Sequence, residues 1–207
     1  MDEVKMSMKE LAKVIHQNAV EHGWWEDERS DAEVRALIHS EWSEALEEAR
    51  AGRPMEWYEC RANGTPCKEE DCDCWFDEVC DEHQLAKKPE GIAVELIDGV
   101  IRILDLLGKE KFQFDDEDWE LNGLKCLCGV AHCENEIGLV GFPVAEVVDC
   151  LHYETATDPI APYHDGYMVA IGVVFAWIRA QGMEPEAILM RKHRYNTTRP
   201  YKHGKKF

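Results

Sequence analysis

The segment KPEGIAVELIDGVIRILDLL, from Lys88 to Leu107, decides the fold class because it reads as a helix of the protein core. Pro89 near its start and Gly108 just beyond its end are typical of helix boundaries. Apolar residues occur on almost every side of the predicted helix. At about 100° per residue the few polar side chains fall on one narrow stripe: Glu95, Asp98, Arg102 and Asp105. This stripe is either solvated or functional.

Helix signals continue on both sides of this segment. Ser7 can cap a first helix that ends near Gly23, and Asp31 can cap a second that runs to about Ala51. Later helices are predicted at about 144–152, 167–181 and 184–195. No alternating run is long enough to predict a β-sheet, so the sequence predicts an all-α fold.

The domain organisation follows from the spacing of these helices. A chain of 207 residues with 45% hydrophobic residues can bury a core as one domain. We expect a single helical domain over 1–207, with insertions at about 56–88, a Cys-rich loop, and at about 110–165, an acidic and Cys-containing loop.

The charge of the chain restricts its partners and its location. A net charge of -19 argues against binding nucleic acid or an anionic membrane surface. The segment from Arg191 to Phe207 is the exception, because it is basic and contains no acidic residue. The first residues, MDEVKMSMKELAK, show no apolar signal-peptide core. We therefore expect a cytoplasmic protein.

The nine cysteines are read as reduced thiols or metal ligands, since no export signal accompanies them. The first insertion holds enough thiols for a structural zinc site, at Cys60, Cys67, Cys72 and Cys74, with Cys80 nearby. Their spacing matches no strong zinc pattern. A second group could form another site or join the first: Cys126, Cys128, His132 and Cys133. Ordinary reduced thiols are the alternative in both places.

The second predicted helix carries the observation that points to chemistry. Its apolar face is defined by Val34, Leu37, Ile38, Ala45 and Ala49. Glu41 and Glu48 point into the middle of that face, with Glu44 at its edge. An unpaired carboxylate in a core is very unfavourable, so these glutamates require a cation.

Two helices therefore carry acids three residues apart, Glu41 and Glu44 on one and Glu95 and Asp98 on the other. Packing the two helices together would bring four carboxylates into one cluster, which cannot exist without neutralisation. Hard oxygen ligands suit Mg²⁺ or Mn²⁺. A merely solvated polar stripe is the alternative for the second pair.

These motifs resemble a known family. HSEWSEALEEAR (His39 to Arg50) and ELIDGVIRILDLL (Glu95 to Leu107) look like the E-x-x-E and E-x-x-D signature of the MazG-like all-α nucleoside triphosphate pyrophosphohydrolases. GWWEDERSD (Gly23 to Asp31) and YNTTRPYKHGKKF (Tyr195 to Phe207) are similar to its single-domain phage and bacterial branch. The resemblance covers most of the chain outside the two insertions.

The resemblance implies a Mg²⁺-dependent enzyme that cleaves a nucleoside triphosphate into the monophosphate and pyrophosphate, in nucleotide-pool house-cleaning. It implies that the metal ligands are Glu41, Glu44, Glu95 and Asp98, and that the protein is a homodimer or homotetramer. Lys192, Asn196 and Arg199 lie where they could hold the phosphates or the sugar.

Two further residues belong to the expected site. Trp25, in the tandem Trp24–Trp25, is either a packing residue or a stacking surface for the base. Ser40 precedes Glu41 where family members often have a second acid, so Glu48 is the substitute candidate for activating water. The preferred base and sugar cannot be read from the residues.

Two other classes of protein compete with this interpretation. A di-iron carboxylate bundle would need Glu-x-x-His on its helices, and none of the nine histidines has a Glu three residues before it. The second alternative is a non-catalytic helical adaptor stabilised by zinc bound to the cysteines.

Overall fold

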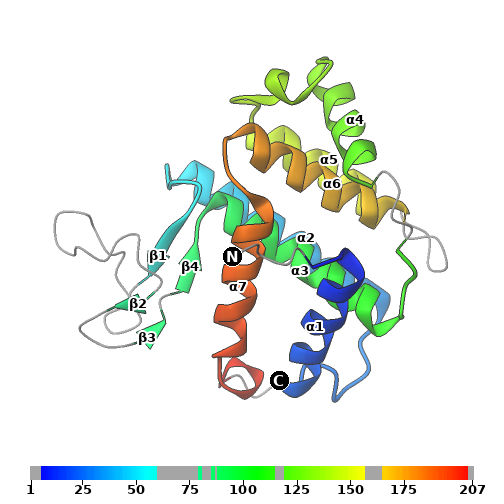
Figure 1. Cartoon of the computed structure of the whole chain (residues 1–207), viewed down its shortest axis with the longest axis vertical. Coiled ribbons are helices and arrows are strands. Elements are labelled where there is room, and N and C mark those ends of the chain that lie inside the picture. Colours follow the sequence, from blue (N-terminus) through cyan, green and yellow to red (C-terminus); the bar gives the residue numbers. More distant parts are fainter. Residues whose placement is uncertain are drawn as a thin grey trace.

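The protein is an all-α bundle, as predicted, in the computed structural model, which describes residues 6–59, 79–80, 85–86, 88–114, 119–156 and 165–204. The helices are α1 (Met8–Glu21), α2 (Asp31–Arg50), α3 (Ile92–Lys109), α4 (Trp119–Ala131), α5 (Val144–Ala156), α6 (Asp165–Ala180) and α7 (Pro185–Thr197). Two short 3₁₀ turns are η1 (Glu136–Leu139) and η2 (Tyr201–Gly204). Figure 1 shows α4, α5 and α6 grouped at one end of the bundle.

Helix α3 is the central element, and it packs against α1, α2 and α7 (Figure 1). Its side chains are buried on most of its circumference, as its continuous apolar pattern predicts. It begins at Ile92, after the predicted start at Pro89, because Gly91 breaks the chain direction with a φ of 115°. A Cβ at Gly91 would lie 2.8 Å from the carbonyl oxygens of Pro54 and Met55, so only glycine fits this close approach.

The first two helices begin with side-chain caps. Ser7 and Glu10 form a capping box at the start of α1. Helix α2 is capped by Ser30, whose side chain accepts a hydrogen bond from the backbone N–H of Glu33. The predicted cap, Asp31, is instead the first residue inside this helix.

Short strands occur where only a loop was predicted. Strand β1 (Trp57–Glu59) pairs antiparallel with β4 (Lys88–Glu90), in the register Trp57 to Glu90. A second pair joins β2 (Val79–Cys80) and β3 (Leu85–Ala86). Two or three residues are too few to show alternation in a sequence. The β1–β4 pair holds Lys88 and Glu90 next to the start of α3.

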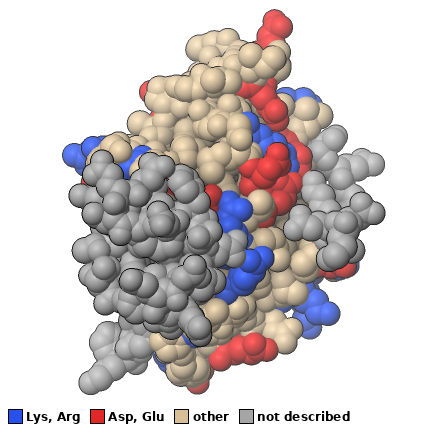
Figure 2. Space-filling model, turned by 60° about the vertical axis from the view of Figure 1, so that its left-hand side comes forward, with Lys and Arg blue, Asp and Glu red and all other residues tan. Residues whose placement is uncertain are grey.

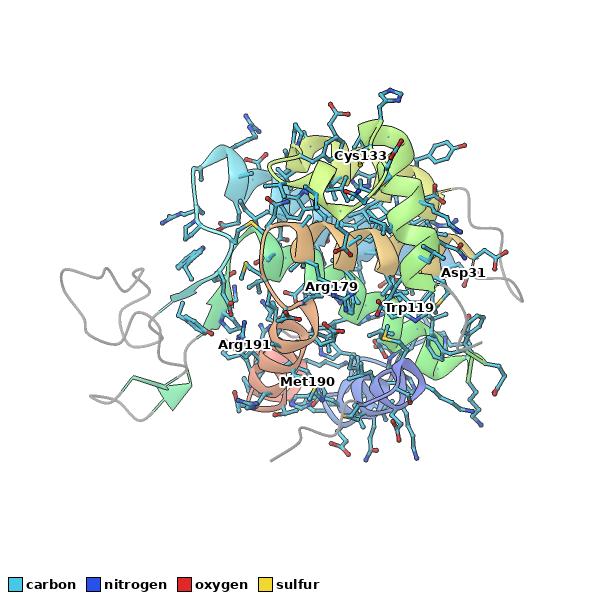
Figure 3. The ribbon with its side chains drawn as sticks, turned by 45° about the horizontal axis from the view of Figure 1, so that its top comes forward. Asp31, Trp119, Cys133, Arg179, Met190 and Arg191 are labelled. Atoms are coloured by element: carbon cyan, nitrogen blue, oxygen red, sulfur yellow. The ribbon has the colours of Figure 1, made fainter. Side chains whose placement is uncertain are left out.

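The second predicted insertion is helical over much of its length, which corrects the expectation of a loop. Helix α5 was expected. Helix α4 was not expected, because the α4 sequence contains Gly123, Gly129 and two cysteines and follows an acidic run. Both helices pack on α6, and α5 also contacts α2. Figure 3 labels Trp119 at the first turn of α4 and Cys133 just past its end.

Helix α6 is apolar because it is a core helix of this second group, and its residues from Ala170 to Ile178 are buried. Among the described helices none is by itself long and apolar enough to cross a membrane. Only α6 and α7 taken together pass such a test, and they are bent by 111°.

Helices α4 and α6 approach to backbone contact at Gly123 and Gly172. A Cβ added to Gly123 would lie 2.1 Å from the carbonyl carbon of Gly172, and this backbone cannot move aside as a side chain could. Gly129, on the exposed side of the same helix, has nothing within 4 Å of such a Cβ.

We predict opposite effects of alanine at these two glycines. Gly123→Ala should lower the free energy of unfolding by at least the roughly 1–3 kcal/mol of an overpacked core. Gly129→Ala should raise it by up to about 1 kcal/mol, through helix propensity alone. Urea unfolding of the two variants measures both changes, and equal stabilities would contradict the described helix crossing.

A histidine pair connects α2 to α5. His39 Nε2 lies 2.9 Å from Thr155 Oγ1, and Thr155 donates its own proton to the Leu151 carbonyl. His39 therefore donates through Nε2 and accepts through Nδ1, which lies 2.9 Å from His152 Nδ1. Burial lowers the pKa of both imidazoles, and for His39 the charge of His152 adds to the effect.

The pair should make stability fall as the pH is lowered. Unfolded imidazoles take up protons near pH 6.5, whereas the folded pair resists protonation, so the unfolded state binds more protons. We predict that the free energy of unfolding decreases from about pH 7 to about pH 6, and that His39→Gln reduces this slope. The exposed His132, replaced by Asn, is the control and should leave the slope unchanged.

Candidate functional site

A polar cavity of about 360 Å³ lies between α1, α2, α3 and α7. Its volume is within the range of small-molecule sites in proteins. The elements contribute different chemistry: α2 and α3 contribute acids, α7 and β4 contribute lysines, and α1 and the α1–α2 connection contribute Asn18, Trp24 and Arg29. All four predicted metal-binding acids line this cavity.

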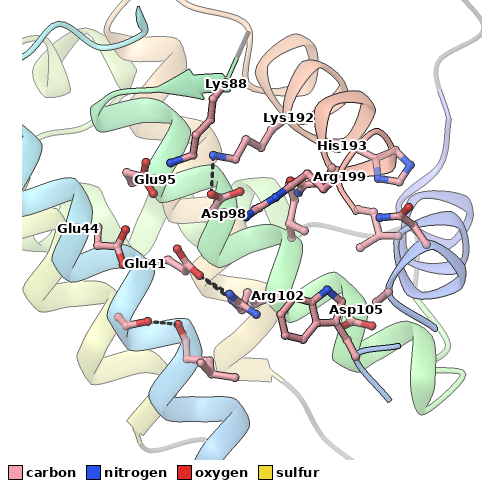
Figure 4. Close-up of a pocket in the computed structure, with 18 of the residues that line it drawn as sticks. Glu41, Glu44, Lys88, Glu95, Asp98, Arg102, Asp105, Lys192, His193 and Arg199 are labelled. Atoms are coloured by element: carbon pink, nitrogen blue, oxygen red, sulfur yellow. Dashed lines mark hydrogen bonds and ion pairs between the residues drawn. The ribbon is translucent and has the colours of Figure 1, made fainter. Parts of the chain in front are cut away.

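Three of these acids converge. One carboxylate oxygen from each of Glu41, Glu95 and Asp98 can be chosen so that all lie within 4.8 Å of one another. Glu41 is 8% exposed and Glu95 is 4% exposed. Glu44 lies one turn further along α2, exposed at the mouth of the same cavity (Figure 4). The structure therefore brings together three of the four acids that the sequence predicts as one cluster, and Glu44 lines the same cavity without joining the three.

Two cations neutralise the cluster. Lys192 of α7 is 2% exposed; its Nζ lies 2.8 Å from Asp98 Oδ2 and donates a hydrogen bond to the Pro89 carbonyl at 3.1 Å. Arg102 binds Glu41 through Nε and Nη2, each 2.7 Å from Oε1 (Figure 4). Each cation thus joins two elements across the cavity.

The burial of the acids changes their protonation. Burial raises the pKa of Glu95 to about 10, with Lys192 opposing the rise and Asp98 reinforcing it. Glu95 is therefore protonated at neutral pH. Burial also raises the pKa of Glu41, against the effect of Arg102.

Glu90 and Lys192 stay charged beside this neutral acid. Burial opposes ionisation of Glu90, but the hydrogen bond from Glu95 and the charge of Lys192 hold its pKa below the usual value. Burial also disfavours the charged form of Lys192, but the negative charges of Asp98 and Glu90 outweigh it and raise its pKa. Lys88 forms an ion pair with Glu90 at the edge of this group.

The donor set fits a hard divalent cation. Glu41, Glu95 and Asp98 present carboxylate oxygens to one point, and these are the ligands that Mg²⁺ and Mn²⁺ prefer. Glu95 is an acid kept neutral in a buried site by a proton, and a bound cation could replace that proton. Glu44 at the rim offers a fourth carboxylate.

The predicted substrate-binding residues fall into two groups. Lys192, Asn196 and Arg199 line the cavity, so α7 and the residues just after it lie beside the acids as expected. Trp25 lines an adjoining hollow instead, where its Nε1 donates to Asp105 at 2.8 Å and the Lys109 ammonium lies 4.3 Å from its ring. Its neighbour Trp24 is the tryptophan that lines the cavity.

Glu48 is not brought to the acid cluster, so its candidacy as the residue that activates water is not supported. It accepts a hydrogen bond of 2.7 Å from Trp57 Nε1, and it does not line the cavity. The reason is helical geometry: Glu48 lies almost two turns beyond Glu41, roughly 10 Å further along the axis of α2. Cys60, Cys67, Cys72 and Cys74 lie outside the described residues.

Several site residues were not predicted from the sequence. Arg102 was visible on the polar stripe of α3, but its pairing with Glu41 depends on how the helices pack. Lys88 and Glu90 depend on the short strand β4, which no periodicity signals. Asn18 also lines the cavity beside the predicted Asn196, and each has a buried amide oxygen without a hydrogen-bond partner among the described residues.

The basic C-terminal segment docks on the α1–α2 connection, which places Arg199. The backbone N–H of Lys202 donates to the His22 carbonyl, and the Lys202 ammonium lies 2.9 Å from Glu26. His22 Nε2 also lies 3.0 Å from the Arg199 carbonyl. Figure 4 shows the Arg199 side chain directed toward Asp98.

Neither the scan against protein-family models nor the searches of curated proteins and of solved structures gave a match to this chain.

The protonation of the cluster predicts different stabilities for two similar substitutions. Glu95→Gln should change the free energy of unfolding by less than about 0.5 kcal/mol, because the replaced side chain is already neutral and Gln can still donate to Glu90. Asp98→Asn should cost about 1–3 kcal/mol, because it removes the charged partner of the buried Lys192. Urea unfolding at neutral pH measures both, with Glu47→Gln on the exposed side of α2 as the control. A larger cost for Glu95→Gln would show that Glu95 is ionised.

Proposed function

We propose that this protein is a Mg²⁺- or Mn²⁺-dependent nucleoside triphosphate pyrophosphohydrolase, which produces the nucleoside monophosphate and pyrophosphate. The observation that carries the proposal is the convergence of Glu41, Glu95 and Asp98 from two core helices within 4.8 Å. The resemblance of the two acidic motifs to the MazG-like family supports the same reaction. The lysines and arginines around the acids add a reason to expect a phosphate-bearing substrate.

In this proposal Glu41, Glu95 and Asp98 hold the metal, with Glu44 close by at the rim. A bound divalent cation would lower the pKa of water and neutralise charge that develops on the leaving pyrophosphate. The rigid core position of the two helices fixes these carboxylates, since α3 is buried on most of its surface. Glu44 replaces Glu48 as the proposed proton acceptor, because it is exposed within the cavity.

The cations of the cavity are the proposed phosphate-binding groups. Lys192 and Arg102 are each paired with an acid, and a metal bound to those acids would release them toward the phosphates. Arg199 lies at the end of α7, where its guanidinium can bind phosphate oxygens bidentately. Figure 2 shows basic side chains gathered beside acidic ones on one face of a molecule whose net charge is -19. A local positive field is needed there to attract a triphosphate.

The nucleoside would lie toward α1 and the end of α7. Asn18 and Asn196 have amide oxygens without a partner among the described residues, and these oxygens can accept hydrogen bonds from a sugar hydroxyl or a base amino group. Trp24 offers an indole face in the same cavity, and Arg29 lies 5.3 Å from its ring centroid. These groups are compatible with several bases, so the substrate class is proposed without a preferred base. Assembly into a homodimer or homotetramer stays a prediction from the family resemblance.

The test is product analysis with a panel of ribo- and deoxyribonucleoside triphosphates in the presence of Mg²⁺. We expect equal amounts of monophosphate and pyrophosphate, and loss of both products with EDTA. Glu41→Gln and Glu95→Gln should reduce kcat by more than the roughly 100-fold lost when a hydrogen-bond partner of a metal ligand is removed. Glu47→Gln should retain full activity.

Two results would overturn the proposal. Release of inorganic phosphate and a nucleoside diphosphate would show cleavage between the β- and γ-phosphates instead of between the α- and β-phosphates. Full activity of either Glu variant would exclude the acid cluster as the catalytic site, because a metal ligand cannot be neutralised without a large loss of rate.

A further inference from the structure

A second cluster of metal-binding side chains lies between α4 and α5, and it shares no residue with the acidic cavity. Cys126 Sγ lies 3.6 Å from Cys150 Sγ and 3.3 Å from Glu154 Oε1. One donor atom from each of these three residues lies within 4.8 Å of the other two. Neither cysteine is in a disulfide bond.

The helices explain why these three side chains meet. Cys150 and Glu154 are four residues apart on α5 and therefore project from the same face. Cys126 projects from the facing helix α4. Cys150 is buried at 6% exposure, whereas Cys126 and Glu154 are partly exposed, which leaves a path by which an ion can enter.

Two of the three separations between donor atoms, those from Cys126 to Cys150 and to Glu154, are close to those of a tetrahedral zinc site. With Zn–S bonds of about 2.3 Å and a Zn–O bond of about 2.1 Å, two tetrahedral ligands lie roughly 3.8 Å apart when both are sulfur and roughly 3.6 Å apart for sulfur and oxygen. The observed separations of 3.6 and 3.3 Å are each within about 0.3 Å of these values. Thiolate sulfur also favours zinc over Mg²⁺ or Ca²⁺.

We propose that Cys126, Cys150 and Glu154 bind one Zn²⁺ ion that cross-links α4 to α5. Binding converts the two thiols to thiolates and releases their protons to solvent. Two thiolates and one carboxylate supply three ligands, and a water molecule completes the tetrahedron. The site differs from the groups that the spacing of cysteines suggests, because Cys150 and Glu154 come from a helix outside both Cys-rich stretches.

The neighbouring thiols do not belong to this site. Cys128 and Cys133 form their own contact of 3.1 Å between sulfur atoms near the end of α4. Neither belongs to the group of donor atoms around Cys126. Cys133 is partly exposed, so replacing it by Ser disturbs the core little and gives a matched control.

The cross-link has a structural reason. Helices α4 and α5 both pack on α6, and α4 does so through the close Gly123–Gly172 contact. Leu121 and Val130 remain exposed on α4, so part of its apolar surface contributes no burial within the chain. A metal bridge would hold α4 in place where apolar contacts are incomplete.

The experiment measures metal binding to the purified full-length protein, with Zn²⁺ and with Co²⁺ as a spectroscopic substitute. We compare the wild type with Cys126→Ser, Cys150→Ser and the control Cys133→Ser. We expect each of the first two variants to bind about one Zn²⁺ fewer per chain than the wild type. The difference Co²⁺ spectrum should show thiolate-to-metal charge transfer and tetrahedral bands. Any Zn²⁺ bound by other cysteines of the chain is common to the wild type and the variants, so it cancels in the difference.

Glu154→Gln provides a second test. It keeps both thiols, so the result does not depend on whether a variant with a replaced buried cysteine still folds. It should weaken Zn²⁺ binding at this site by about tenfold or more, as loss of a ligand or of its partner does. Zn²⁺ should raise the Tm of the wild type and of Cys133→Ser by more than that of Glu154→Gln. Glu154→Gln should still release pyrophosphate in Mg²⁺ as the wild type does, because this site shares no residue with the acidic cavity.

The proposal is overturned if Cys126→Ser binds as much Zn²⁺ as the wild type with the same Co²⁺ spectrum, or if Glu154→Gln has unchanged affinity. The three side chains would then be a hydrogen-bonded thiol cluster only.

Discussion

The burial of acidic side chains on α3 is the constraint on which the candidate site depends. Glu95 and Asp98 occupy a helix whose other faces are packed on α1, α2 and α7, so these acids cannot reach bulk water freely. The chain compensates with a proton on Glu95 and with the buried ammonium of Lys192. Because Lys192 also binds the Pro89 carbonyl, this one ion pair ties α7 to α3 and to β4. A buried pair contributes little net stability but strongly disfavours other arrangements that leave one charge unpaired.

The same constraint connects structure to the proposed chemistry. In the proposed function, a divalent cation would replace the positive charge that this cluster needs, and the paired lysine and arginine would then be available for phosphate. The two halves of the molecule offer different ligands: carboxylates around α2 and α3, and two thiols with one carboxylate between α4 and α5. Oxygen ligands favour Mg²⁺ or Mn²⁺ and thiolates favour zinc, so the two sites should not compete for the same ion.

Much of the bundle could be predicted from the sequence because its helices have long periodic patterns. The ends of α2, α6 and α7 lie within two residues of the predicted ends. The meeting of Glu41 with Glu95 and Asp98 was also predictable, since each pair has the same spacing on a helix that must bury its face. Helix α4 was missed because its glycines resemble loop signals, although Gly123 is there to let α6 approach. The prediction named Trp25, but Trp24 is the tryptophan that lines the cavity. Spacing alone cannot rank two adjacent residues.

The sequence by itself determined that the chain is helical and that acids of two core helices must be neutralised, because an unpaired carboxylate is excluded from an apolar core. Only the tertiary structure decided which cations neutralise them. Lys192 and Arg102 reach Asp98 and Glu41 across more than sixty positions of sequence. The tertiary structure also decided that Glu48 lies away from the cavity and that Cys126 meets Cys150. Pairings of this kind depend on which helix faces are in contact, and no local pattern records that.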